Sequence, residues 1–204
     1  MANTNTSVKR KRIGASKPYY AKVTAENVGT YPTYGEVKPF SEFVALTESI
    51  QTAESKFHSN NRLSDDLKVF KQCDLTFEND GLSPDVSAEV FGLDIDSESG
   101  ELKYGGMKNP PFIGFAFFRE LMGADSKRYY EGVYYPKCKA FVGNSTDNTR
   151  GENIDFKGDT VNMCAYALDD TDETWKIERM CETEAEAEAW CKEKLGFSVP
   201  NGEE

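Results

Sequence analysis

The chain has 204 residues, of which 12% are aromatic, and its formal net charge is −11. This length suits a single all-β domain, and the aromatic side chains supply enough apolar surface to drive folding. Removing the +4 of Lys9, Arg10, Lys11 and Arg12 leaves −15 on residues 13–204, which repels a phosphate backbone and disfavours nucleic-acid binding.

Membrane and disulfide-bonded proteins are disfavoured as classes. No stretch approaches the roughly 20 apolar residues of a membrane helix, and residues 1–12 are polar where a signal peptide is apolar. The cysteines are odd in number and form no close pairs, which favours reduced, mostly buried thiols over disulfides or a zinc site. They are Cys73, Cys138, Cys164, Cys181 and Cys191. We expect no membrane insertion and folding in a cytoplasm.

The N-terminus carries an isolated basic cluster on a leader rich in Ser, Thr and Asn. Such a cluster also occurs in nuclear-localisation and nucleic-acid-binding segments. Because the rest of the chain is acidic, we favour a flexible basic arm over residues 1–12. Its Lys9, Arg10, Lys11 and Arg12 would dock on an acidic neighbour or stay solvated.

The first part of the body reads as a strand followed by a long two-stranded ribbon. Residues 18–24 form the expected strand, and the Gly, Pro and Tyr residues of 29–35 a loop. Residues 36–59 and 67–78 form the ribbon, which spans 36–78 in all. Its second run alternates: Leu67, Val69, Cys73, Leu75 and Phe77 fall on one face, while the opposite, wet face includes Gln72, Asp74 and Thr76. A twelve-residue strand spans roughly 40 Å, which is long for a compact sandwich.

A polar stretch separates the two runs. Its turn-forming residues predict the mobile tip of the ribbon, which is either an ordinary hairpin loop or a loop that contacts another subunit. The candidate contact residues are Asn60, Asn61, Arg62, Leu63, Ser64, Asp65 and Asp66.

A short helix is expected at residues 84–91. Ser83 suits its N-cap, Pro84 its first position, Asp85 its positive end and Gly92 its termination. The acids that follow, from Asp94 onward, resemble the start of a calcium loop, but the glycine and the final glutamate positions do not match, so a solvated turn is favoured.

Further strands are predicted at 111–119, 129–142, 153–168 and 173–180, where apolar runs alternate with Gly, Asn and Asp clusters. The capping sequence Thr183 to Glu186 predicts a second helix at 184–195, within a C-terminal segment 182–196 and before a frayed tail at 197–204. The fold class is therefore mainly β, a β-sandwich or partly closed barrel over 13–181, with a short flanking helix and a C-terminal helix.

Catalytic machinery is not evident. The one histidine, His58, lies in a strand of mixed polarity, and no serine has a nucleophile-elbow pattern around it. No Cys or His pair has metal-ligand spacing, and no phosphate-binding loop occurs. We expect no enzyme activity, no cofactor and no metal. A stable β body with long appendages is typical of a self-assembling subunit, since an unprotected strand edge recruits another chain.

Several segments, taken in order, resemble the major tail tube proteins of long, non-contractile-tailed bacteriophages. The most specific is Thr149-Arg150-Gly151-Glu152 leading into Asn153–Phe156, which opens a strand ending near Trp175. The resemblance covers about residues 13–180 and excludes the basic leader and the Glu-Ala helix. The other segments are 20–24, 34–37, 86–92, 100–102 and 133–141.

The resemblance implies a β-sandwich with a flanking helix, six subunits per ring, and rings stacked into a tube within the virion. Ribbons of neighbouring subunits would pair into an inner barrel through which genomic DNA passes without specific binding. Tape measure, terminator and distal tail proteins are the implied partners. Gln72, Asp74 and Thr76 are the candidate lumen residues, because acids and small polar groups repel phosphates.

Two alternatives remain open at this stage. One is a head-tail connector or tail terminator, which forms single rings. The other is a monomeric carbohydrate-binding module that uses Tyr129, Tyr130, Tyr134 and Tyr135 as a platform.

Overall fold

The computed structural model describes residues 9–26, 28–59, 62–96, 98–106, 109–143 and 158–197 of the chain. It is mainly β, with 56% strand and 12% helix, and its centre is one large antiparallel sheet. The predicted fold class is thereby confirmed. Two predicted features lie outside the described residues. One is the frayed tail at 197–204, of which Phe197 alone is described, and the other is the stretch 144–157 with its Thr-Arg-Gly-Glu sequence.

The sheet has nine strands, and most neighbours along it are distant in sequence. Its main path runs β2-β1-β8-β9-β10-β5-β4, while β3 pairs with β1 and β11 with β9. A separate two-stranded sheet joins β6 (Asp94–Ile95) and β7 (Leu102–Lys103). The strands of the large sheet are β1 (Arg10–Ala25), β2 (Thr33–Tyr34), β3 (Lys38–Pro39), β4 (Phe43–Ser59), β5 (Arg62–Asn79), β8 (Phe112–Gly123), β9 (Arg128–Val142), β10 (Asp159–Ala165) and β11 (Ile177–Cys181).

The large sheet curls so that its two ends approach each other. β4, the last strand of the path, lies beside β1 without a hydrogen-bonded ladder between them, so the barrel is only partly closed. Its interior holds an aromatic core in which Phe40 meets Phe77 and Phe115 edge to face, with ring centroids 5.4 and 5.7 Å apart. Edge-to-face packing is a preferred geometry of aromatic pairs, so Phe40, which lies between β3 and β4, joins β5 to β8.

The two helices begin and end as predicted. Helix α1 (Pro84–Phe91) is capped by the Ser83 hydroxyl, which accepts from the Val86 amide, and Gly92 ends it with a φ of 65°. Helix α2 (Glu184–Lys194) begins at Thr183, whose hydroxyl accepts from the Glu186 amide. The N-caps of both helices and the glycine that ends α1 follow ordinary capping chemistry.

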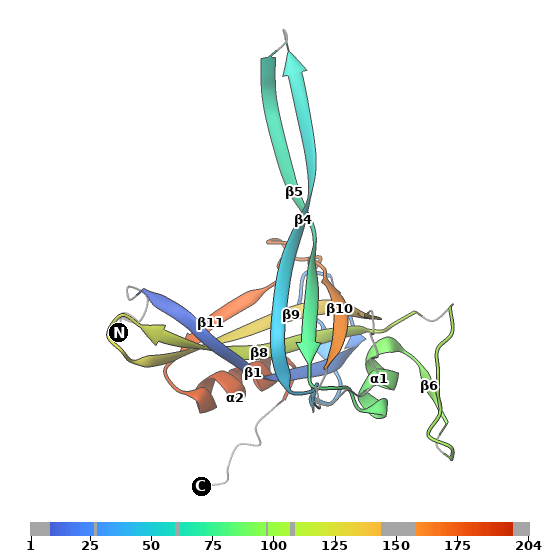
Figure 1. The fold of residues 1–204 in the computed structure, drawn as a ribbon. Helices are drawn as coiled ribbons and strands as arrows, with labels where there is room; N and C mark the ends of the chain where they lie inside the picture. The colour runs from blue at the N-terminus through green and yellow to red at the C-terminus, as the bar shows by residue number, and fades with distance from the viewer. Residues whose placement is uncertain are drawn as a thin grey trace, which may run out of the picture.

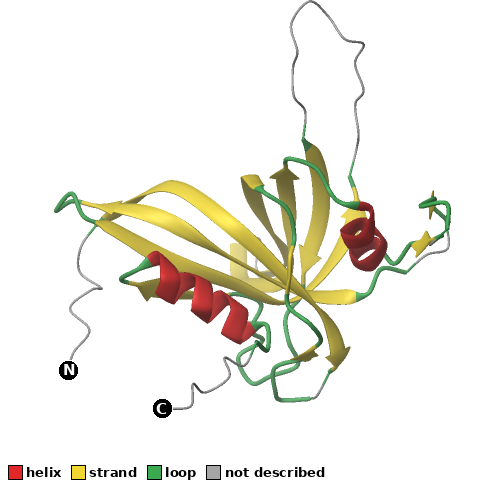
Figure 2. Ribbon diagram, turned by 90° about the horizontal axis from the view of Figure 1, so that it is seen from below, coloured by secondary structure: helices red, strands yellow, loops and turns green. Residues whose placement is uncertain are grey.

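Helix α2 covers the outer face of the sheet, opposite the barrel interior (Figure 2). Its predicted apolar stripe is buried against β8, β9 and β11. Trp190 needs a glycine beneath it, because a Cβ on Gly132 would stand 2.3 Å from the Trp190 Cε3. The helix is therefore part of the body. The stripe consists of Ala187, Trp190, Cys191 and Leu195.

The N-terminal prediction needs correction. The flexible arm expected for residues 1–12 is wrong for Arg10, Lys11 and Arg12, which form the start of β1 and pair with Gly123, Met122 and Leu121 of β8. Lys9 also accepts a backbone hydrogen bond from Ala124. The reason is that β8 extends to Gly123 and would otherwise present an open edge here. Residues 1–8 lie outside the described residues.

Candidate assembly interface

The ribbon is the most prominent feature of the molecule. Strands β4 and β5 pair from Phe43 and Asn79 at the base to Ser59 and Arg62 at the far end, and their distal halves stand well away from the body (Figure 1). At roughly 3.3 Å per residue, 17 and 18 residues give strands of about 55–60 Å. This is about three times the common strand length.

Support from the rest of the sheet ends partway along the ribbon. Strand β10 pairs with β5 only from Asn79 to Cys73. Within the described ranges, the part of β5 from Arg62 to Gln72 pairs with β4 alone, and β4 itself ends the sheet. Each backbone there offers an edge of N–H and C=O groups that invites another strand.

The predicted tip is shorter than expected. Arg62, Leu63, Ser64, Asp65 and Asp66 do not form a loop but belong to β5, and all but Ser64, which a register shift skips, have backbones paired to β4. The cross-strand ladder that extends from 67–78 overrides their turn preference, as tertiary context often does. Asn60 and Asn61 lie outside the described residues.

A register shift changes which side chains face the core. Between Gln51 and Thr52 of β4 the pairing skips Lys71 of β5, which is a β-bulge. Beyond it Phe70 turns inward and stacks on Trp175 at 5.0 Å. Leu67 and Val69 are therefore 59% and 44% exposed, and the predicted single face with Cys73, Leu75 and Phe77 is wrong for these two residues.

The opposite face of the sheet base is polar, as the alternation predicts. Cys73, Leu75 and Phe77 are buried, so the residues between them point outward. Paired residues on β4 and β10 share this side. We call it the polar sheet face: Thr47, Ser49, Gln51, Gln72, Asp74, Thr76, Glu78, Thr160, Asn162 and Cys164.

Two of the three candidate lumen residues interact with each other on this face. The Gln72 amide donates to the Asp74 carboxylate at 2.6 Å, and the Cys164 thiol lies 3.3 Å from the same oxygen. Burial and the nearby carboxylate of Asp74 raise the pKa of the Cys164 thiol, so it stays protonated at neutral pH. Thr76 lies one pair further along, opposite Thr47.

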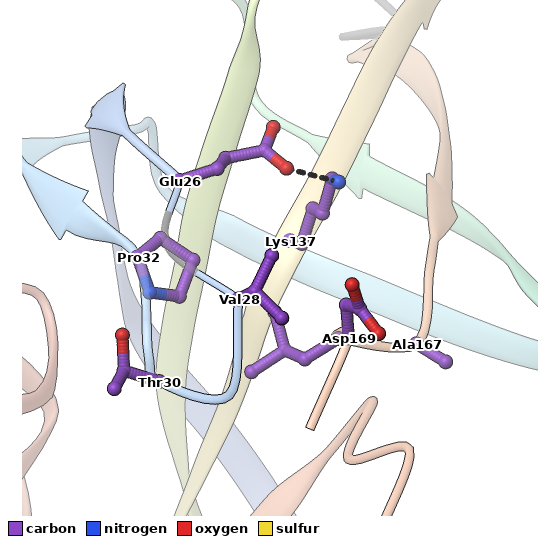
Figure 3. A pocket seen from close by; sticks show the side chains of 8 residues that line it. Glu26, Val28, Thr30, Pro32, Lys137, Ala167 and Asp169 are labelled. Atoms are coloured by element: carbon purple, nitrogen blue, oxygen red, sulfur yellow. Dashed lines mark hydrogen bonds and ion pairs between the residues drawn. The ribbon is translucent and has the colours of Figure 1, made fainter.

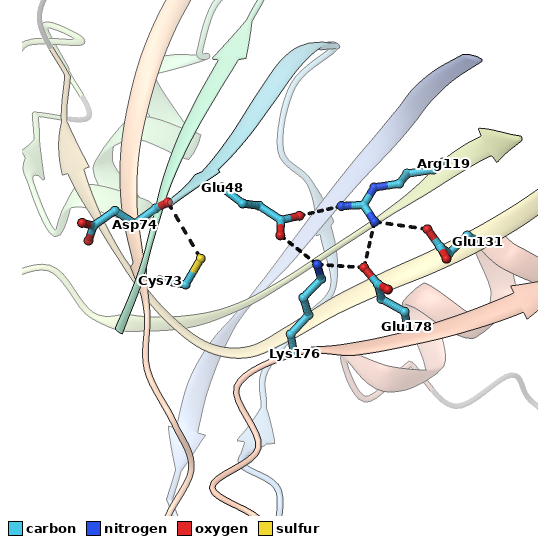
Figure 4. A network of polar contacts seen from close by, with 7 residues as sticks. All are labelled: Glu48, Cys73, Asp74, Arg119, Glu131, Lys176 and Glu178. Atoms are coloured by element: carbon cyan, nitrogen blue, oxygen red, sulfur yellow. Dashed lines mark hydrogen bonds and ion pairs between the residues drawn. The ribbon is translucent and has the colours of Figure 1, made fainter. Parts of the chain in front are cut away.

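A buried ion network anchors the ribbon to the body (Figure 4). The Arg119 guanidinium of β8, only 7% exposed, contacts Glu48 of β4 at 2.5 Å, Glu178 of β11 at 2.8 Å and Glu131 of β9 at 3.1 Å. Lys176 bridges Glu48 and Glu178 at 2.8 and 2.7 Å. Four strands thus meet through five charges at the base of the ribbon.

The charges of this network hold one another ionised. Burial alone would raise the pKa of Glu48, but the hydrogen bond from Lys176 and the charge of Arg119 outweigh it, so the pKa lies below its ordinary value. The pKa of Glu178 is lowered in the same way by Lys176 and Arg119 against burial. Both carboxylates therefore stay charged well into the acid range.

The network was missed in the sequence, although a signal existed. Arg119 shares its strand face with Phe115 and Phe117, which the core buries. A charge at the next inward position of an apolar alternation indicates a buried ion pair. Two partners of Arg119, Glu48 and Glu178, come from β4 and β11, which are distant in sequence from β8, so no local pattern brings them together.

The pocket beside the loop after β1 is small for a ligand site. It has a volume of about 170 Å³; Glu26 and Lys137 form an ion pair across its edge (Figure 3). Small-molecule sites are commonly 300–1,000 Å³ and mostly apolar. Among the described residues, no three His, Cys, Asp or Glu side chains cluster as a metal site would require.

The tyrosine platform is contradicted by burial. Tyr134 and Tyr135 are 1% and 0% exposed, because they face α2 and the barrel interior respectively. A surface that stacks on sugar rings needs exposed aromatic faces. The expected thiol chemistry is confirmed, since all five cysteines are free and four of them are buried.

No protein-family model matches this sequence, and a search of curated proteins finds no match. No helix within the described ranges is both long and apolar enough to cross a membrane.

Proposed function

We propose that the chain is the subunit of a bacteriophage tail tube, in which rings of six copies stack into a conduit for DNA. The observation that supports it most is the ribbon, whose distal halves of β4 and β5 pair only with each other in the described part of the chain. A lone molecule leaves these edges to water, whereas neighbouring copies complete the ladder.

Exposed apolar side chains on the ribbon agree with this role. Leu67, Val69 and Ile50 are 59%, 44% and 56% exposed. Covering them removes about 25 cal/mol of unfavourable free energy per Å² of apolar surface. Adjacent ribbons in a ring supply such cover along with the missing hydrogen bonds.

The polar sheet face supports the conduit. Its ten residues include two acids, Asp74 and Glu78, and on β9 Lys139 stands opposite Cys164 on the same side, so acids outnumber bases there by two to one. Lys68 on the ribbon is paired with Glu54 at 2.7 Å, which neutralises its charge locally. A lumen lined in this way repels phosphates and keeps DNA from sticking. The ends of the tube would meet tape measure, terminator and distal tail proteins.

Negative-stain electron microscopy of the purified chain tests the proposal. We expect rings and tubes from the wild type, and a folded monomer from Leu67→Lys/Val69→Lys, because the new charges cannot be buried between ribbons. Val28→Lys is the matched control: Val28 is 83% exposed in the loop after β1, and its substitution should leave assembly intact.

The outcomes separate the candidate functions. Tubes of indefinite length support the tail tube, whereas single rings that never stack support the connector or terminator. A wild-type chain that remains monomeric at every concentration, with an ordered ribbon, contradicts both.

A further inference from the structure

The two ends of the β8–β9 hairpin differ in charge. One end holds the start of β1 and the β8–β9 turn, where residues 9–14 and 120–128 carry the bases Lys9, Arg10, Lys11, Arg12, Lys127 and Arg128 and the acids Glu120 and Asp125. We call it the basic end. Lys11 and Arg12 are exposed there, and Ile13 beside them is 49% exposed. The acids of α2 begin nearby at Glu184, which pairs with Lys17 of β1.

An apolar groove lies at the opposite end. It has a volume of about 410 Å³ and is lined by α1, by the residues around β6–β7 and by the last residues of β9. Exposed apolar side chains border it, among them Tyr104 at 62% and Val142 at 55%. The lining includes Phe91, Leu93, Tyr104, Pro110, Phe141 and Val142.

Acids flank this groove. The hairpin of β6 and β7 begins after Leu93 and ends before Tyr104, both of which line the groove. Between them stand Asp94, Asp96, Glu98 and Glu101 with one base, Lys103. An apolar cleft beside several acids is complementary to an apolar residue flanked by bases, which is the arrangement around Ile13.

A single molecule cannot bring these surfaces together. They lie at opposite ends of the body (Figure 1), and β9, which runs between them, has 15 residues, on the order of 45–50 Å at roughly 3.3 Å per residue. We infer that the basic end of one copy docks in the acid-flanked groove of the next, with Ile13 against the apolar lining and Lys11 and Arg12 against the β6–β7 acids.

This contact rests on the proposed assembly and deepens it, because it joins unlike surfaces of identical chains. A head-to-tail contact of this kind closes into a ring when the rotation between copies permits. It thus supplies a lateral contact within the ring that is separate from ribbon pairing.

Charge exchange tests the contact by analytical ultracentrifugation. Two double variants each place like charges together at the contact: Lys11→Glu/Arg12→Glu and Glu98→Lys/Glu101→Lys. For each variant alone, the association constant should fall on the order of ten-fold or more. Mixing the two variants restores attraction at every contact and should restore association. So should one chain carrying all four substitutions. Circular dichroism checks that each variant is folded.

Asp172→Lys/Glu193→Lys is the matched control, since it changes two exposed acids that belong neither to the groove lining nor to the basic end and adds the same charge as the acid-side variant. It should associate as the wild type does. If rings or tubes form equally well from every variant, or if the control fails like the others, the contact is overturned while the proposed function stands. If the wild type never associates, both are overturned.

Discussion

Arg119→Met should destabilise the chain strongly, because methionine replaces the stem of the side chain but not its charge. Three carboxylates then remain at the base of the ribbon with Lys176, whose ion pairs are with Glu48 and Glu178. Removing one partner of a buried ion network costs about 3–5 kcal/mol. Since Glu178 is 36% exposed and water can reach it, we expect the lower end, about 3 kcal/mol.

Urea unfolding at pH 7 measures this loss. For a domain of about 200 residues, 3 kcal/mol corresponds to a fall in melting temperature of about 6–12 °C. Arg128→Met is the matched control: Arg128 pairs with Glu120 at 2.8 Å but is 65% exposed, and exposed pairs contribute about 0–1 kcal/mol.

Carboxylates left without Arg119 should account for most of this loss of stability. If stranded carboxylates cause the loss, Glu48→Gln should cost less in the Arg119→Met background than in the wild type, since it removes a charge that has lost one of its two partners and keeps only Lys176. The loss should also shrink as the pH falls through the ordinary range of glutamate, where these groups become neutral. A loss below 1 kcal/mol, or a cycle without coupling, would refute this reasoning.

Three further outcomes concern α2. Trp190→Ala should cost about 3–5 kcal/mol in urea unfolding, because a buried ring leaves a cavity, whereas Glu193→Ala on the exposed side of the same helix should cost less than about 0.5 kcal/mol. Gly132→Ala should cost about 1–3 kcal/mol through overlap with Trp190; equal stability would contradict the packing. Burial opposes ionisation of Glu188, but hydrogen bonds from Lys17 and Lys192 lower its pKa to about 2. Its contribution to the free energy of unfolding is therefore present above the unfolded pKa of 4.5 and is lost as the pH falls toward 2. Glu188→Gln should abolish this part of the loss of stability in acid.

Local patterns were sufficient wherever one interaction decided the structure. The alternation from Cys73 to Phe77 predicted the buried and wet faces, and Ser83, Gly92 and Thr183 predicted helix boundaries, because caps act within one turn. Local sequence patterns gave the wrong structure where a strand distant in sequence determined the backbone conformation. Turn-forming Asp65 and Asp66 pair with β4, and the basic run joins β8, because an available strand edge outweighs local preference.

The ion network explains how the ribbon can both protrude and keep one direction. An apolar contact alone tolerates sliding, because burial is not directional. Ion pairs to Arg119 and Lys176 require particular distances and fix Glu48 of β4 relative to three other strands. Beyond Cys73, where pairing with β10 ends, the described part of the ribbon is held by its own ladder and the Phe70–Trp175 stack. The orientation of the ribbon is therefore fixed at its base. A neighbouring copy would meet strand edges that already have a defined orientation, which lowers the entropic cost of pairing.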